Sequence, residues 1–358
     1  MPLFSGSYEP DDVTILLKPT AIAPVAIDEK ERLIQSGARH YSEMLSAEKL
    51  PDQRYMALYR EALARNAGRL KADIETLAQA IAARLETERE CVLISLARAG
   101  TPIGVLLKRA LSRLGVAAHH YSISIIRDRG IDRNALRFIA ARHGTRTSLF
   151  VDGWTGKGTI KGELTRSLAK DDLGFSPYLA VVADPAGCAD LAATTEDYLI
   201  PSGLLNGIVS GLISRSVLRD DLVGPDDFHA CLYQVEHTGH DLTRHFVSDI
   251  ELADAVSVGA PWTLESAAET RPRCLALVER LMSDFDIRDV NRIKPGIAEA
   301  TRAILRRVPH LVLVRERADP EIQHLLHLAR QADVPVREHD LHFYRAATVI
   351  KSLGGCQE

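Results

Sequence analysis

The sequence predicts an α/β protein with a parallel-sheet core, a helical N-terminal extension and a small C-terminal α/β domain. Short apolar, β-branched segments alternate with amphipathic segments of helical length between residues 91 and 190. Apolar residues recur every three or four positions along Tyr55–Leu85, within a mainly helical region at 1–90. The alternation of strands and helices returns on a smaller scale over 290–358. These observations predict domains at 1–90, 91–289 and 290–358.

The core elements are expected in a regular order. The apolar runs predict strands at 91–97, 119–126, 147–152 and 178–184. Pro102 suits the first turn of a helix, and Gly144 suits the end of one. Helices are therefore expected at 27–44, 55–85, 102–114, 132–143 and 160–170. Residues 191–289 are expected to form helices and loops, including a hood, packed over the sheet.

The last 69 residues, 290–358, predict five elements. Their patterns indicate a helix at 296–307, a strand at 311–315, a helix at 318–333, a strand at 334–339 and a final helix at 341–355. Gly354 would stop that last helix.

Composition excludes several classes of protein. Hydrophobic residues make up 46% and charged residues 26%, which is typical of a globular protein and not of a disordered one. The net charge of −4 excludes a nucleic-acid binder with a wholly basic surface. No window has the roughly 18 apolar residues of a membrane helix. Five scattered cysteines form no CxxC pair, so we expect a reduced, cytoplasmic protein.

The segment that follows the strand at 147–152 is suited to holding phosphate. Three glycines in Gly153–Thr159 let the backbone approach an anion, and a helix N-terminus follows. The run matches neither a Walker loop nor G-x-G-x-x-G, and an ordinary tight connection explains the glycines equally well. Asp152 is placed to accept hydrogen bonds from sugar hydroxyls, or to serve as a turn residue.

SLFVDGWTGKGT resembles the ribose-phosphate loop of type I phosphoribosyltransferases, and LARAGTPIG resembles their pyrophosphate loop. SIIRDRGID lies where those enzymes carry a mobile covering loop. The resemblance implies Asp152, Lys157 and Arg98 as catalytic residues. It implies that phosphate and pyrophosphate are held by Thr155, Gly156, Lys157, Gly158, Thr159, Ala99, Gly100 and Thr101, with Arg127 and Arg129 closing over them. Gly153 replaces the second acidic residue that the family pattern usually carries.

A closer resemblance covers nearly the whole chain. The words GSYEPDDVTILLK, HYSEML, VADPAG and LIPSGLLNGIVSGLISRSV are similar to a bacterial family associated with tellurium-resistance-type gene clusters. That family joins the core to a C-terminal Pelota/L7Ae-like RNA-binding domain, and some members are labelled cysteine protease StiP.

The C-terminal segment is basic within an acidic chain. Residues 290–358 carry 11 Lys and Arg against 8 Asp and Glu, a net charge of +3, so the remainder carries −7. The Pelota/L7Ae resemblance implies RNA binding, and the alternative is a structural or dimerising appendix with a mildly basic face. The expected RNA contacts are Arg292, Lys294, Gly296, Arg315 and Arg317.

The resemblance implies a phosphoribosyltransferase that acts on phosphoribosyl diphosphate or a nucleotide-like substrate, with Mg²⁺ bound through that substrate. Such a reaction needs positioning and charge neutralisation more than a protein nucleophile. The alternative is a non-catalytic sensor of a phosphoribosyl ligand. We also expect a homodimer, and Asp152 is the one protein side chain considered as a metal ligand.

A cysteine hydrolase is the third hypothesis. A nucleophilic cysteine needs a lowered pKa and partial exposure. Cys231, near His229 and His237, is the best candidate in the sequence, but no protease signature surrounds it. His237 and His240 also suggest a metal cluster, although a solvated helix start explains them better. His40–Glu43 could reach the active site from the N-terminal extension, or simply cap a helix.

Overall fold

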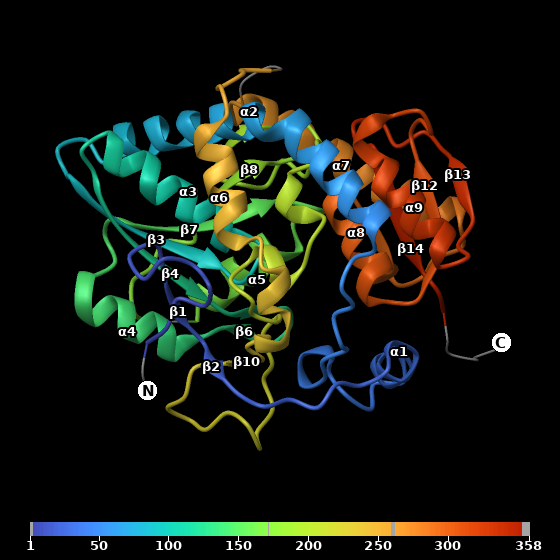
Figure 1. Ribbon diagram of the computed structural model, residues 1–358, viewed down its shortest axis with the longest axis horizontal. Helices are drawn as coiled ribbons and strands as arrows, with labels where there is room; N and C mark the ends of the chain where they lie inside the picture. The colour runs from blue at the N-terminus through green and yellow to red at the C-terminus, as the bar shows by residue number, and fades with distance from the viewer. Residues whose placement is uncertain (1–2, 171, 259–261, 353–358) are drawn as a thin grey trace.

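The computed structural model describes residues 3–170, 172–258 and 262–352, and it confirms the α/β fold class (Figure 1). Its core is a six-stranded sheet in the order β1–β4–β3–β7–β8–β9, and every neighbouring pair is parallel. The strands are β1 (Thr14–Leu16), β3 (Glu90–Leu96), β4 (Ala117–Ile123), β7 (Ser148–Trp154), β8 (Leu179–Ala183) and β9 (Leu191–Thr194).

Helices cover both faces of this sheet, as continuous apolar strands require. Leu93 packs into the cluster that holds the first helix pair, whereas its neighbour Ile94 packs with Phe150 into the cluster of the second pair. The first pair is α2 (Gln53–Arg84) and α3 (Gly100–Arg113), and the second is α4 (Arg133–His143) and α5 (Thr159–Leu168).

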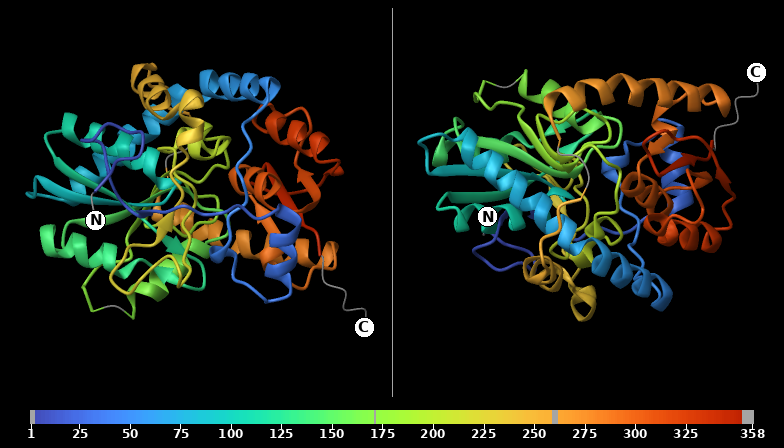
Figure 2. Two further views of the ribbon diagram at one scale, coloured as in Figure 1. Left: turned by 60° about the horizontal axis from the view of Figure 1, so that its bottom comes forward. Right: turned by 90° about the horizontal axis from the view of Figure 1, so that it is seen from above.

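The long helix α2 connects the two parts of the molecule. Asp52 caps it by accepting a hydrogen bond from the Tyr55 N–H at 2.7 Å. Its 32 residues span about 48 Å at about 1.5 Å per residue. Figure 2 shows it running from the sheet toward the C-terminal domain, where Asn66 donates hydrogen bonds to Glu321.

The C-terminal domain is a small α/β unit with a four-stranded sheet in the order β11–β14–β12–β13. β14 is antiparallel to both of its neighbours, and β12 pairs with β13 in parallel. Its elements are β11 (Ile293–Pro295), α8 (Ile297–Arg306), β12 (Pro309–Val314), α9 (Gln323–Gln331), β13 (Val336–Glu338) and β14 (Ala346–Ile350).

The prediction of a final helix at 341–355 is wrong. Ala346–Ile350 forms β14, which is buried along its whole length between β11 and β12. A strand buried on both faces is uniformly apolar, and periodicity alone does not distinguish it from a buried helix. Gly354, the expected stop, lies outside the described residues. β1 was also missed, because three residues are too few to show a pattern.

Three further helices lie around these two sheets. The helix α7 packs its buried residues Cys274, Leu277 and Leu281 against the C-terminal sheet. α1 lies beside the same domain, far along the chain from it (Figure 1). Two short strand pairs complete the fold. These elements are α1 (Ile27–Gln35), α6 (Thr243–Leu252), α7 (Leu264–Asp284), β2 (Lys18–Pro19) with β10 (Ala230–Cys231), and β5 (Ile125–Ile126) with β6 (Gly130–Ile131).

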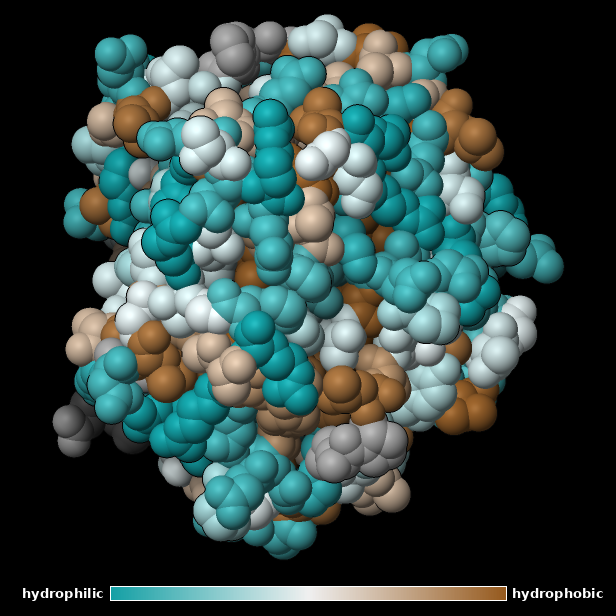
Figure 3. All heavy atoms as spheres, turned by 90° about the vertical axis from the view of Figure 1, so that its left-hand side faces the viewer, coloured by the Kyte–Doolittle hydropathy of each residue, from teal (hydrophilic) through white to brown (hydrophobic). Residues whose placement is uncertain are grey.

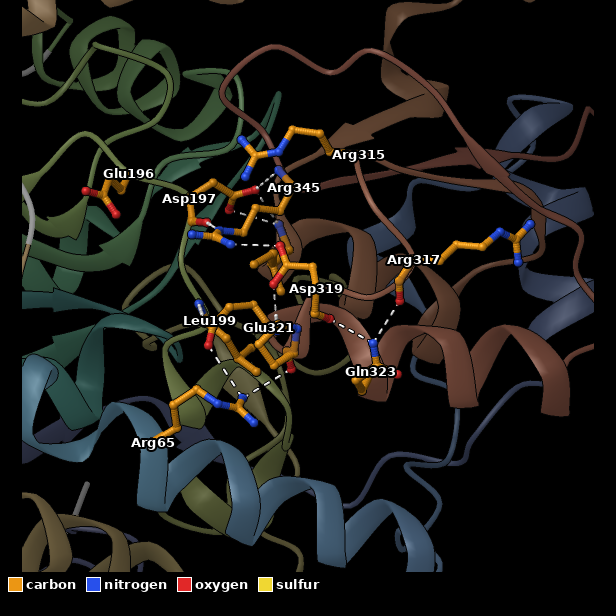
Figure 4. A network of polar contacts seen from close by, with 12 residues as sticks. Arg65, Glu196, Asp197, Leu199, Arg315, Arg317, Asp319, Glu321, Gln323 and Arg345 are labelled. Atoms are coloured by element: carbon orange, nitrogen blue, oxygen red, sulfur yellow. Dashed lines mark hydrogen bonds and ion pairs between the residues drawn. The ribbon is translucent and has the colours of Figure 1, made fainter.

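A polar network joins the core to the C-terminal domain (Figure 4). The Asp197 carboxylate, from the segment after β9, accepts hydrogen bonds from the backbone N–H groups of Ile297 and Arg345. The Glu321 carboxylate accepts one from the N–H of Leu199 at 2.7 Å. Hydrogen bonds to buried charged groups are among the stronger ones in proteins, so this network fixes the domain against the sheet.

One outer face of the molecule is mostly polar. Hydrophilic residues cover most of the side that carries α3 and α4, with only small separate hydrophobic groups in that view (Figure 3). Within the described residues, no helix combines the length and apolar character needed to cross a membrane.

Candidate functional site

A basic cavity of about 320 Å³ lies between the core sheet and the C-terminal domain. Its walls come from the ends of β3 and β7, the glycine-rich turn, α1, β11 and α8. Ten lysines and arginines line it, against two acidic residues, Asp152 and Glu299. The basic residues are Lys30, Arg98, Arg127, Lys157, Lys161, Arg215, Lys294, Arg302, Arg306 and Arg307.

The glycine-rich turn lies on the floor of this cavity, as the sequence predicted. Thr155, Gly156, Lys157, Gly158 and Thr159 all line it. Gly158 has φ +85° and immediately precedes α5, and a side chain there would collide with the guanidinium of Arg271. The Arg271 side chain can move aside, so the positive φ is what favours glycine at this point.

One side of the turn is held by the C-terminal domain. The Tyr344 hydroxyl donates a hydrogen bond to the carbonyl oxygen of Gly156. The Lys157 ammonium donates to the carbonyls of Val290 and Ile293, so it contacts protein oxygens where a phosphate contact was expected. Burial and the nearby Lys294 lower the pKa of Lys157 to about 7.

Asp152 lies at the end of β7 and lines the cavity. Burial raises the pKa of its carboxyl to about 7, so it is partly protonated at neutral pH. Its Oδ1 accepts a hydrogen bond from the N–H of Gly153 at 2.8 Å. A carboxyl in this state can accept or donate a proton.

Some residues of the loop after β3 line the cavity, and the others pack in the core. Arg98 and Ala99 line the cavity, and Arg98 is buried in an ion pair with Glu48. Gly100 packs so closely against β7 that a side chain would meet the Val151 carbonyl at 2.2 Å. Thr101 faces the sheet, where its hydroxyl bonds that of Ser122 at 2.7 Å. Thr101 is therefore buried and does not line the cavity, and its contact with a ligand stays a prediction.

The two arginines of the expected covering loop differ in their position relative to the cavity. Arg127 lines the cavity and donates a hydrogen bond to Asn291 of the C-terminal domain at 2.9 Å. Arg129 is exposed, pairs with Glu43 at 2.6 Å and does not line the cavity. Only the first is placed to contact a ligand there.

The five residues predicted to contact RNA do not share one face. Lys294 lines the cavity, and Gly296 is buried at the start of α8 with φ +90°. Arg292 donates to the Ile350 carbonyl. Arg315 and Arg317 are exposed beyond the end of β12 (Figure 4). The predicted RNA contacts stay predictions, and Arg315 and Arg317 are the two of them that are exposed.

Several basic residues of the cavity were missed in the sequence. Arg302, Arg306 and Arg307 lie on and just after α8, and Lys30 comes from α1. The spacing of Arg302 and Arg306 places them on one face of α8, which is a recognisable signal. Nothing in the sequence indicates that this face meets the glycine-rich turn.

None of the four described cysteines has a histidine partner, and Cys356 lies outside the described residues. Cys91, Cys231 and Cys274 are fully buried, and burial raises the pKa of the Cys231 thiol to about 12. Cys231 lies in β10, so the preference for it as an exposed nucleophile is wrong. Cys188 is partly exposed.

The histidine groups lie away from the cavity. His237 and His240 lie in a short 3-10 helix, Val235–His240, none of whose residues is buried, and they are not among the described residues whose ligand atoms cluster. His40 accepts a hydrogen bond from the Ser42 N–H, which is the capping alternative. A group the sequence did not reveal, Glu90, His119 and His143, brings its ligand atoms within 4.8 Å of one another.

Residues 6–251 match the family described as tellurite-like stress resistance cysteine protease StiP. A protein named cysteine protease StiP, from Acinetobacter baylyi, is 44% identical over 98% of this chain and 95% of its own length. The chain belongs to the StiP family. Residues 273–352 match the PELOTA RNA binding domain. The family resemblance drawn from the sequence, including its link to tellurium resistance, is consistent with these matches.

The prediction of a phosphoribosyltransferase is wrong. The family and its relative carry the name of a cysteine protease, not of a transferase. Two hypoxanthine phosphoribosyltransferase structures resemble part of the chain. The Trypanosoma cruzi enzyme and the Leishmania tarentolae enzyme with GMP are each 15% identical over 37% of this chain and 82% of theirs, with TM-scores of 0.29. A similarity at that level carries no argument about function.

The partner, metal ion, oligomeric state and location were predicted together with the transferase activity, and each has its own outcome. Phosphoribosyl diphosphate has no support as a partner. The Mg²⁺ ion, the homodimer and the cytoplasmic location stay predictions.

Proposed function

We propose that this protein is a cysteine protease of the tellurite-like stress response that also binds RNA through its C-terminal domain. The observation that carries the protease half is the 44% identity, over 98% of the chain, to a protein named cysteine protease StiP. Identity of this extent covers both parts of the molecule, so the two chains share their overall organisation.

Cys188 is the nucleophile that the described structure supports best. A thiol must reach its substrate, and Cys91, Cys231 and Cys274 are fully buried. Cys188 is partly exposed and follows β8, near the carboxyl edge of the parallel sheet where such folds place their sites.

The thiol of Cys188 is not activated in this conformation. Burial and the Asp184 carboxylate raise its pKa to about 12, while Arg271 acts in the opposite direction. Forming the thiolate at pH 7 would then cost about 7 kcal/mol, at about 1.4 kcal/mol per pKa unit. A proteolytic cycle must therefore lower this pKa when substrate binds.

Hydrolysis of a casein substrate by the full chain tests this proposal. Cys188→Ser should abolish thiol-dependent hydrolysis, and Cys231→Ser, a buried control, should retain it. Full activity in Cys188→Ser would reject Cys188 as the nucleophile. Loss of activity in Cys356→Ser alone would place the nucleophile in the C-terminal tail.

The match of residues 273–352 to an RNA-binding domain supports the second half of the proposal. Arg315 and Arg317 are exposed and can approach phosphates without a change in the fold. Arg315→Glu with Arg317→Glu should weaken RNA binding and lower the salt slope by about one per lost contact. Arg137→Glu, an exposed charge reversal on α4, is the matched control. Unchanged RNA affinity in the double variant would contradict this placement.

A further inference from the structure

The basic cavity carries positive charge that the protein itself does not neutralise. Some of its cations have protein partners. Arg98 pairs with Glu48, Arg307 with Glu31, and Lys161 with Asp190. These pairs hold the walls together and leave no charge for a ligand.

Three other cations have neither an ion pair nor a side-chain hydrogen bond with the described residues, whereas Arg215 and Arg306 donate to carbonyl and amide oxygens. Lys30 is 4% exposed, and neither it nor Lys294 makes a side-chain hydrogen bond or ion pair with any described residue. The Arg302 guanidinium stacks 4.4 Å from the centre of the Trp154 ring, and its buried Nε has no hydrogen-bond partner. A buried polar atom without a partner, such as the Arg302 Nε, is rare in native proteins and calls for an explanation.

The lowered pKa values of two cavity lysines also indicate positive charge that is not neutralised. Burial, Arg215 and Arg307 lower the pKa of Lys30 to about 7. Burial also lowers the pKa of Lys294, to about 8, against the attraction of Glu299. Cations held together out of water disfavour their own charged forms, and an anion between them would reverse this.

We propose that this cavity binds a compact, multiply charged oxyanion, with Lys30, Lys294 and Arg302 as its ligands. About 320 Å³ is at the small end of ligand pockets, which suits a small polyanion and not a nucleic-acid strand. The turn at Gly158 adds the N-terminus of α5, which favours negative charge.

The proposed ligand also connects separate parts of the chain. Lys30 comes from α1, the glycine-rich turn from the core, and Arg302 from α8 of the C-terminal domain. An anion bound to all three would tighten the contact between the core and that domain. The proposal does not rest on proteolysis or on RNA binding.

Calorimetric titration of the full chain with inorganic pyrophosphate and with tripolyphosphate tests the proposal. Saturable binding is expected, with chloride at equal ionic strength giving none. Arg302→Gln and Lys294→Gln should each weaken it about 10- to 100-fold, as expected for a lost charge-assisted contact. Arg330→Gln, on the exposed surface of α9, should bind like the parent chain.

Two outcomes would overturn the proposal. The first is the absence of saturable binding by the parent chain, or an unchanged affinity in Arg302→Gln with its fold intact by circular dichroism. The second is displacement of pyrophosphate by a short RNA in the parent chain but not in the Arg315→Glu/Arg317→Glu variant, which would make the cavity part of an RNA surface.

Limited proteolysis should show slower cleavage between core and C-terminal domain when the anion is bound.

Discussion

On the core wall of the basic cavity the buried cation Arg98 is paired with an acid, whereas on the C-terminal wall Arg307 is paired and two of its neighbours are not. On the core wall, Arg98 is buried against Glu48 and also donates hydrogen bonds to Ile213 and Asn206. On the opposite wall, Lys294 and Arg302 face the cavity and form no ion pair with any described residue. A paired buried cation supports the fold, whereas an unpaired one opposes folding and persists where a ligand needs it. Residue type alone does not separate the two roles.

The largest expected effect comes from breaking the buried pair on the core wall. Although burial acts to raise it, the Arg98 guanidinium lowers the pKa of Glu48 to about 2. Glu48→Gln would leave the Arg98 charge buried without compensation, so the free energy of unfolding should fall by about 3–5 kcal/mol. Urea denaturation at pH 7 measures this. Glu61→Gln, which removes an exposed pair with Arg54, is the control and should change stability by less than about 1 kcal/mol.

A smaller effect, of opposite sign, is expected for Lys30, which lines the cavity from α1. Burial, together with Arg215, Arg307 and Arg306, lowers the pKa of Lys30 to about 7, against the attraction of Glu31. The unfolded chain therefore binds more protons than the native one between pH 7 and 10, and stability should rise with pH there. The gain from this group is about 2 kcal/mol between pH 7 and 9.

Lys30→Met removes the titrating group and should flatten that rise. Urea denaturation of both chains at pH 7 and pH 9 measures the difference in slope. At pH 7 the variant should be at least as stable as the parent. A variant that is strongly destabilised at both pH values, with the slope unchanged, would show that Lys30 is paired in solution.

The smallest effect on stability is expected at Arg129, which the sequence analysis placed over the ligand and which forms an exposed ion pair. Arg129 pairs with Glu43 at the surface and does not line the cavity. Arg129→Gln should change the free energy of unfolding by less than about 1 kcal/mol. Its affinity for pyrophosphate should equal that of the parent chain. A loss comparable to that of Arg302→Gln would show that this loop closes over the cavity when an anion binds.

The sequence predicted the core sheet well because its strands are long, apolar and separated by clear helices. The segments at 91–97, 147–152 and 178–184 became β3, β7 and β8, and the glycine-rich turn lies where they end. It predicted the last element wrongly, because β14 is uniformly apolar and its pairing with β11 and β12 is a long-range contact.

The sequence by itself determined the family, the alternation of strands and helices, and the turn at Gly158 whose backbone needs glycine. Only the tertiary structure decided which cations meet. Lys30 and Arg302 are separated by most of the chain, and each is unremarkable among its neighbours in the sequence. Packing of the C-terminal domain on the core removes both from bulk water and places them around one cavity. Their unpaired charge is thus a consequence of long-range contacts, which composition and periodicity do not record.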